Sequence, residues 1–244
     1  MKELIRKALQ KRGYEIRSLK APDIEEKFLA IRAKSAPYTM TSRERQYALY
    51  QAVEYIESAN IPGDIVECGV WKGGSTMLAA LTLLSHASTD RSLYLYDTFA
   101  GMSAPTDKDV NLHDHAAQSK WEALSHDGVN DWDYASLAEV KEHLASTGYP
   151  ADKVVFVEGK VEETIPNVLS ESIALLRLDT DWYESTKHEL QHLFPLLVPG
   201  GVLIIDDYGH WKGARQAVDE YLKEKKVRIL LQRVDYTGRM GVKI

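Results

Sequence analysis

Two apolar segments of the sequence, residues 174–178 and 202–205, each end in acidic side chains. If both segments form parallel strands of one sheet, their carboxyl ends meet at the same edge and bring these acids together. Crowded carboxylates repel one another, so such a cluster indicates a bound cation or a shared proton. Oxygen ligands with no cysteine nearby indicate Mg²⁺, Mn²⁺ or Ca²⁺. The candidate residues are Asp179, Asp181, Asp206 and Asp207.

A glycine-rich turn is the second feature of the sequence that could bind a ligand. From Glu67 to Ser75 the chain reads ECGVWKGGS, between a predicted strand and a predicted helix. Glycines such as Gly69 let a ligand approach the backbone closely, because no Cβ stands in the way. The turn matches neither the dinucleotide-binding fingerprint nor the P-loop, so phosphate binding is not favoured. Glu67 suits a cationic or hydroxyl-bearing ligand, and Cys68 is expected to be a small buried residue.

A third acid follows the next predicted strand, where Leu93-Tyr94-Leu95-Tyr96 ends in Asp97. An acid at this position of an α/β sheet is placed to accept hydrogen bonds from ribose hydroxyls across the crevice. The alternative is that the glycines form only a tight turn and that Asp97 only caps a helix. The presence of both Glu67 and Asp97 favours the ligand site.

Two short patterns suggest other chemistry. Residues 188–192 read H-E-x-x-H, which on a helix is a zinc-binding pattern. Pro195 and the Pro-Gly-Gly at 199–201 end that helix soon afterwards, and no convincing third ligand follows, so zinc is rejected. Asp179-Thr180-Asp181 also matches the D-x-D of many metal-dependent glycosyltransferases. Three residues are a weak signal, and glycosyl transfer stays open at this point.

The candidate site residues must be positioned by the strands and helices of the fold. From residue 60 onward, short apolar runs alternate with amphipathic stretches. This alternation predicts a doubly wound α/β fold with a mostly parallel sheet. Residues 1–60 are predicted to form a helical cap or lid over a main domain of residues 61–244. Residues 101–133 form a polar insertion without clear periodicity, as expected for a lid or binding loop. The predicted strands are 65–70, 92–96, 154–157, 174–178, 202–205, 227–234 and 240–244, and the predicted helices 42–56, 75–85, 134–146, 186–197 and 214–225.

Further candidate site residues lie in the insertion and in the segment that follows Asp206 and Asp207. In the insertion they could line a substrate pocket, and packing within a polar loop is the alternative. After the acidic pair they could contact the metal ligands from behind. The residues are His113, His115, Trp121, His126 and Trp132 in the insertion, and His210 and Arg215 after the acidic pair.

Composition narrows the class of protein. The chain has 244 residues, with 30 Lys and Arg against 36 Asp and Glu, a net charge of −6. An acidic balance argues against nucleic acid as the main partner. One cysteine excludes an intrachain disulfide framework and a cysteine-cluster zinc site. The start does not resemble a signal peptide, and no apolar stretch is long enough to span a bilayer. We therefore expect a cytoplasmic protein with a small-molecule partner.

Four segments, taken in order, resemble the macrocin O-methyltransferase family of metal-dependent sugar O-methyltransferases. The resemblance covers about residues 38–244 and implies a Rossmann-like fold for S-adenosylmethionine (SAM) with a seven-stranded sheet and an antiparallel strand at residues 240–244. The segments are IPGDIVECGVWKGG at 61–74, YDTFAGM at 96–102, LDTDWYEST at 178–186 and PGGVLIIDDYG at 199–209.

The resemblance also implies roles for individual residues. The metal ligands would be Asp179, Asp206 and Asp207, and Asp181 matches the proposed general base. The methionine end of SAM would contact Glu67, Gly69 and Ser75. Asp97 would bind the ribose, and Glu158 and Gly159 would lie near the adenine. Met40 and Thr41 fall where the family places a lid over SAM.

The predicted function is Mg²⁺- and SAM-dependent methylation of a hydroxyl on a sugar or glycosylated natural product. A sugar hydroxyl is a poor nucleophile, and a divalent cation can lower its pKa and fix its orientation. A catechol-type phenol is an alternative acceptor, since the same chelation serves it. A glycosyltransferase and a non-catalytic SAM-binding module are alternatives from other classes. The sequence is compatible with a homo-oligomer but does not define one.

Overall fold

The computed structural model describes residues 5, 7, 9, 11–12 and 23–244 of the chain. A seven-stranded sheet has the strand order β5-β2-β1-β6-β7-β9-β8. The first five strands in this order are parallel, and β9 pairs antiparallel with β7 and β8. The predicted mostly parallel sheet with an antiparallel strand near the C-terminus is therefore confirmed. The strands are β1 (Asp64–Cys68), β2 (Leu93–Asp97), β5 (Val154–Glu158), β6 (Ile173–Leu178), β7 (Leu197–Ile205), β8 (Gln232–Arg233) and β9 (Arg239–Val242).

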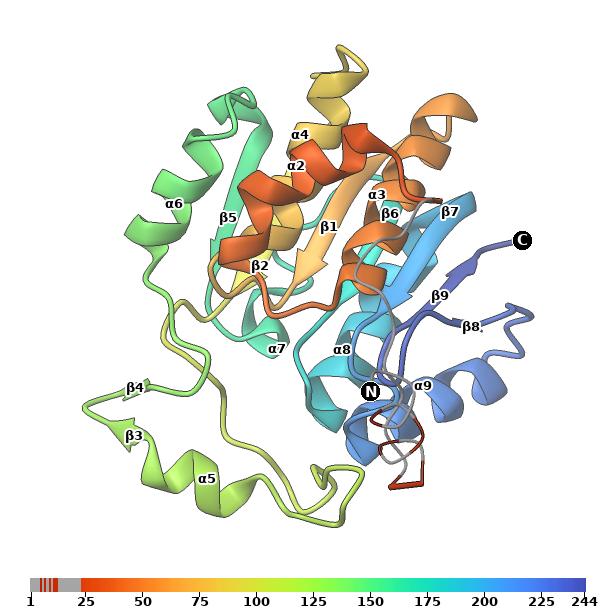
Figure 1. Cartoon of the computed structure of the whole chain (residues 1–244). Coiled ribbons are helices and arrows are strands. Elements are labelled where there is room, and N and C mark those ends of the chain that lie inside the picture. The colour runs from red at the N-terminus through yellow and green to blue at the C-terminus, as the bar shows by residue number, and fades with distance from the viewer. Residues whose placement is uncertain (1–4, 6, 8, 10, 13–22) are drawn as a thin grey trace.

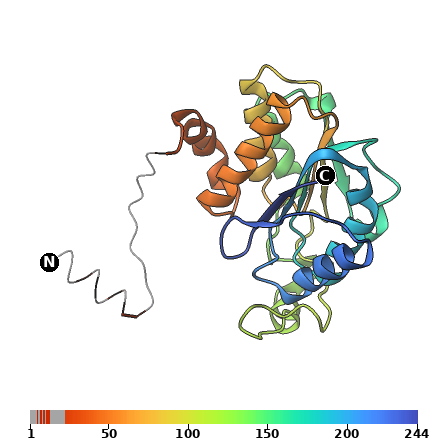
Figure 2. The same ribbon diagram turned by 90° about the vertical axis from the view of Figure 1, so that its right-hand side faces the viewer.

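Helices cover both faces of the sheet, as Figure 2 shows with α2 and α3 on one side and α9 on the other. Neighbouring residues of a strand therefore enter different cores. Leu175 belongs to the cluster that includes residues of α2, α3, α4 and α6, and Leu176 to the cluster that includes residues of α8 and α9. Burial on both faces explains why these strands are continuously apolar. The helices are α2 (Glu26–Ser35), α3 (Arg43–Ser58), α4 (Gly74–Ser85), α5 (Gln118–Ala123), α6 (Leu137–Ala145), α7 (Val161–Thr164), α8 (Tyr183–Leu193) and α9 (Lys212–Glu224).

The N-terminal helix α3 packs on β6 and β7 of the sheet, and α2 packs on α3 and α4. Phe28 and Ile56 are fully buried in the same cluster as the strand residues Ile65 and Leu95. The α3 helix begins after Ser42, whose Oγ accepts a hydrogen bond from the Arg45 N–H at 3.1 Å, as an N-cap residue does. Most of residues 1–22 of the predicted cap lie outside the described residues. The division of the chain at residue 60 stays a prediction.

Helix boundaries differ from the prediction where a cap or a proline decides them. The predicted helix 134–146 begins at Leu137, because the Ser136 side chain caps it by accepting from the Glu139 N–H. The predicted helix 186–197 begins at Tyr183 and ends at Leu193, where a 3-10 turn containing Pro195 follows. The glycines predicted to separate helix from strand lie inside β7. Of the described helices, none is long and apolar enough to cross a membrane.

The predicted strand at residues 227–234 is wrong over most of its length. Only Gln232 and Arg233 form a ladder with β9. Val227, Ile229 and Leu231 instead turn their side chains onto the core beside α8 and α9. The alternation of apolar and polar residues in this segment arises because one side of it is buried, and such burial does not require pairing with another strand.

The insertion at residues 101–133 contains more regular structure than its sequence indicates. It holds α5 and a two-stranded hairpin of β3 (Ser125–His126) and β4 (Val129–Asn130). It lies beneath the carboxyl ends of the strands in Figure 1. Its last tryptophan, Trp132, packs with Trp182 and Trp211, at ring-centroid distances of 5.6 and 6.1 Å. This contact fixes the end of the insertion against the loops that follow β6 and β7.

Candidate active site

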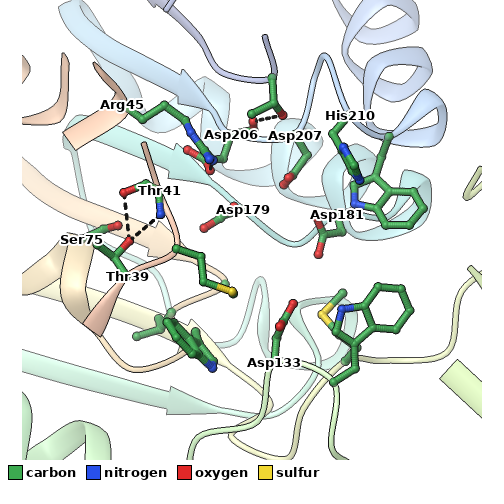
Figure 3. A pocket seen from close by; sticks show the side chains of 18 of the residues that line it. Thr39, Thr41, Arg45, Ser75, Asp133, Asp179, Asp181, Asp206, Asp207 and His210 are labelled. Carbon is green, nitrogen blue, oxygen red and sulfur yellow. Dashed lines mark hydrogen bonds and ion pairs between the residues drawn. The ribbon is translucent and has the colours of Figure 1, made fainter. Parts of the chain in front are cut away.

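A cavity of about 400 Å³ opens where the parallel strands end, a volume typical of small-molecule sites. Its walls come from the loops after β1, β2, β6 and β7, from the segment before α3 and from the insertion. Figure 3 shows Asp179, Asp181, Asp206 and Asp207 on one side of this cavity, and Thr39, Thr41 and Ser75 on another. The predicted site residues that line the cavity are Met40, Thr41, Gly69, Ser75, Asp97, Asp179, Asp181, Asp206 and Asp207.

The glycine loop is held by Asp97. One carboxylate oxygen of Asp97 accepts hydrogen bonds from the Val70 and Trp71 N–H groups at 2.6 and 3.0 Å, and the other accepts from the Phe99 N–H at 2.8 Å. The pKa of Asp97 is raised above its usual value because burial outweighs these backbone hydrogen bonds, which act to lower it. Asp97 thus orders the loop and also lines the cavity.

Gly69 is required where the loop passes the end of β6. Its φ is +81°, and an added Cβ would lie far inside van der Waals contact with the backbone oxygen of Asp179. We expect Gly69→Ala to lower the free energy of unfolding by at least about 2 kcal/mol, measured by urea denaturation. Gly128→Ala is the matched control, because Gly128 has the same φ and open space around it. Equal losses in the two variants would contradict the steric argument.

Three carboxylates converge after β6 and β7. Leu178 pairs with Ile205 in the parallel ladder, so the acids that follow these strands become neighbours. Oxygen atoms of Asp179, Asp206 and Asp207 all lie within 4.8 Å of one another. Burial and the neighbouring carboxylates raise the pKa values of Asp179 and Asp207 well above their usual range. The predicted gathering of acids at this edge is therefore present.

Asp181 lies beside this group and faces the cavity. Its backbone has φ +65°, a left-handed conformation that turns the chain between β6 and α8. Its carboxyl group hydrogen-bonds to that of Asp207, and burial, with repulsion from Asp179, raises the pKa of Asp181 to about 7. A carboxyl group at this position can take up a proton near neutral pH.

Arg177 neutralises the group from below, which the sequence analysis missed. This arginine sits within β6 and is buried, with Nη1 2.5 Å from Glu67 and Nη2 2.7 Å from Asp179 and 3.0 Å from Asp206. Glu67 also accepts a hydrogen bond from the Thr76 hydroxyl. Glu67 is therefore turned beneath the cavity and does not line it, and its predicted contact with SAM stays a prediction.

Removing Arg177 should be costly because it would leave buried carboxylates without their counterion. We expect Arg177→Met to lower the free energy of unfolding by about 3–5 kcal/mol, measured by urea denaturation. Arg228→Met, on an exposed position after α9, is the matched control and should change stability by less than about 0.5 kcal/mol. A small loss in Arg177→Met would show that Glu67, Asp179 and Asp206 do not depend on this guanidinium.

The acidic group fits a divalent cation. Its donors are carboxylate oxygens, which Mg²⁺ prefers, and Asp206 Oδ1 is buried without a hydrogen bond from any described residue. Arg177 Nη2 lies 3.0 Å from that oxygen, in an ion pair without hydrogen-bond geometry. The crowded carboxylates raise one another's pKa values even with Arg177 beside them, and a bound cation would relieve this repulsion. Asp179, Asp206 and Asp207 would hold the ion.

The remaining predicted cofactor residues lie at the edge of the site. Gly159 lines a smaller neighbouring cavity of about 60 Å³, together with Asp97 and Thr180. Glu158 follows on the sheet opposite Asp97 but is exposed. The predicted position of these residues near an adenine ring is not tested by the geometry.

Residues of the H-E-x-x-H segment at 188–192 form hydrogen bonds within the protein interior. Glu189 is fully buried and accepts a hydrogen bond from the Thr180 hydroxyl at 2.9 Å, and His188 Nε2 lies 2.9 Å from the Ile165 carbonyl oxygen. Among described residues, the group able to hold a metal includes no member of this segment. Burial beneath the loop after β6 explains the pattern without a metal.

The wall opposite Ser75 contains residues from distant parts of the chain. Trp132 lines the cavity as suggested, but His113, His115, Trp121 and His126 do not. His210 also lines the cavity, although it was suggested to contact the metal ligands from behind, and Arg215 pairs with Asp219 at 3.7 Å. The insertion also contributes residues that the sequence analysis missed. The missed lining residues include Arg45, Lys120, Asp133, Trp211, Tyr236 and Thr237.

Comparisons with known proteins match this sequence and fold to one class, the Rossmann-like O-methyltransferases. The solved structure of the O-methyltransferase NovP superimposes with a TM-score of 0.74 at 30% identity, covering 84% of this chain and 82% of NovP. The model of the Macrocin-O-methyltransferase (TylF) family matches residues 1–241.

Curated relatives agree with the family match. The chain is 33% identical to the 8-demethyl-8-(2,3-dimethoxy-alpha-L-rhamnosyl)-tetracenomycin-C 4'-O-methyltransferase of Streptomyces olivaceus, over 89% of this chain and 80% of that protein. It is 32% identical to the mycinamicin III 3''-O-methyltransferase of Micromonospora griseorubida, over 82% and 76%. The chain belongs to the macrocin O-methyltransferase family and is a SAM-dependent O-methyltransferase. The glycosyltransferase and non-catalytic alternatives are thereby set aside.

Proposed function

We propose that this methyltransferase acts on a hydroxyl group of a sugar-like acceptor and requires Mg²⁺ held by Asp179, Asp206 and Asp207. The observation that carries the proposal is that one cavity joins the glycine loop to the buried carboxylates. A methyl donor against the loop and a hydroxyl beside the carboxylates would share that space. The relative from Streptomyces olivaceus, whose name contains a rhamnosyl group, supports this acceptor class.

The proposed cofactor contacts lie on the side of the cavity formed by the glycine loop, away from the converging carboxylates. Gly69, Ser75, Met40 and Thr41 are proposed to contact the methionine end of SAM, and Asp97 the ribose. Glu158 and Gly159 are proposed to lie by the adenine. When bound, SAM supplies an electrophilic methyl group, and a divalent cation supplies charge that lowers the pKa of a nearby hydroxyl.

This chain's residues then orient the acceptor and move its proton. Asp181 is proposed to accept the hydroxyl proton at its carboxylate, within a hydrogen bond of Asp207. The tryptophans Trp132 and Trp211 form an apolar wall of the cavity and exclude water from that side. Holding the nucleophilic oxygen in line with the methyl group supplies much of the rate.

The test is a transfer assay with acceptors that differ in one feature. The full chain is incubated with SAM and methyl rhamnoside, its deoxy analogues that lack one vicinal hydroxyl, or catechol, and products are identified by mass. We expect a methylated rhamnoside, loss of product with EDTA, and recovery with Mg²⁺. Methylation of catechol alone would favour the phenolic acceptor, and full activity in EDTA would contradict the metal requirement.

A further inference from the structure

Two arginines share the carboxylate of Asp206. Arg177 Nη2 lies 3.0 Å from Oδ1, and Arg45 Nη1 donates a hydrogen bond to Oδ2. Figure 3 shows the Arg45 side chain reaching Asp206 from the cavity side. Both oxygens of a proposed metal ligand are thus engaged by protein cations, and a divalent ion that binds Asp206 must compete with at least one of them.

The two guanidinium groups are not equally fixed. The Arg177 side chain is 4% exposed and contacts three carboxylates within the sheet. The Arg45 side chain is 15% exposed, lines the cavity, and has a second partner in Asp235, whose Oδ2 accepts from Nε at 3.1 Å. Arg45 can therefore leave Asp206 and remain paired, whereas Arg177 cannot leave without stranding buried charge.

Arg45 also connects two segments at the mouth of the cavity. Ser42, which caps α3, donates its hydroxyl proton to Asp235 Oδ2 at 2.7 Å. Asp235 Oδ1 accepts the N–H groups of Thr237 and Gly238 at 2.9 and 2.7 Å. The segment before α3 and the turn between β8 and β9 thus meet at the side chain that pairs with Asp206.

We propose that Arg45 is an exchangeable counterion of Asp206 that a divalent cation displaces, so that metal binding is coupled to the segment at residues 39–42. The proposal rests on the metal site of the proposed function. In the metal-loaded protein Arg45 pairs with Asp235 alone. Arg45 is a positioning residue, because it acts through Asp206 and through the segment that precedes α3.

Two substitutions of this pair have opposite expected effects. Arg45→Met removes the competitor, so the Kd for metal should fall at least about fivefold, a usual size for coupling between sites. Asp235→Asn removes the alternative partner of Arg45 and leaves a side-chain oxygen for the Thr237 and Gly238 N–H groups. Displacing Arg45 then costs more, and the Kd should rise by about the same factor.

The experiment is isothermal titration of the full chain with Mn²⁺ and with Mg²⁺, with Arg228→Met as an unchanged control. Hydrogen exchange of the peptide around Thr41 is a second readout: it should rise with Mn²⁺ in the wild type and not respond in Arg45→Met. An unchanged or higher Kd in Arg45→Met overturns the proposal. If that variant does not fold, an unchanged or lower Kd in Asp235→Asn overturns it. If the wild-type chain binds neither Mn²⁺ nor Mg²⁺, the proposed metal site is wrong, and this proposal, which rests on it, is wrong as well.

Discussion

Asp181→Asn is expected to lower kcat for methyl transfer about 10²–10⁴-fold, the usual contribution of a positioned base. Asparagine keeps the shape of the side chain but cannot accept the acceptor's proton. Binding of SAM and of Mg²⁺ should stay close to the wild type, because Asp181 is not one of the three converging ligands. Single-turnover rates at saturating SAM and Mg²⁺ measure the effect.

The control for this substitution is Asp131→Asn, an exposed acid of the insertion, which should retain wild-type kcat. An Asp181→Asn enzyme with full turnover at saturating Mg²⁺ would sink the assignment of Asp181 as the base. Another group would then have to take up the hydroxyl proton.

Asp207→Asn is expected to weaken Mg²⁺ binding and to lower kcat by about 10³-fold at ordinary Mg²⁺ concentrations. A metal contributes several kcal/mol of transition-state stabilisation, and each 1.36 kcal/mol is a factor of ten. Raising the Mg²⁺ concentration should recover part of the lost rate in this variant. The same addition should not help Asp181→Asn, because that variant lacks a base and retains its ligands.

Titration of Mn²⁺ into the Asp207→Asn protein checks the cause of the loss. Affinity equal to that of the wild type would contradict the role of Asp207 as a ligand, whatever the activity. Partial rescue by metal in one variant and none in the other separates the roles of two neighbouring acids whose pKa values are both raised by burial.

The sheet and the acidic cluster were predictable because both depend on local sequence. Continuous apolar runs report burial on both faces, and the acids directly after them must lie at one edge of a parallel sheet. The segment at residues 227–231 shows the limit of this argument. Its alternating side chains face the core, but only the next two residues, Gln232 and Arg233, pair with β9, although Leu230 lies beside Gly241 of that strand.

The missed site residues differ in what could have revealed them. Arg177 carried a usable signal, because a charge inside a buried strand requires a partner, and Glu67, on the adjacent strand β1, offers one. Arg45, Asp133 and Tyr236 carried no such signal. Their places in the cavity depend on how α3, the insertion and the turn after β8 fold back over the sheet.

A crystal structure of the protein with S-adenosylhomocysteine and Mn²⁺ tests the central claim most directly. We predict an anomalous peak coordinated by Asp179, Asp206 and Asp207, with the cofactor product lying against Gly69 and Ser75 in the same cavity. Manganese bound elsewhere, or the cofactor product bound away from the glycine loop, would contradict the account.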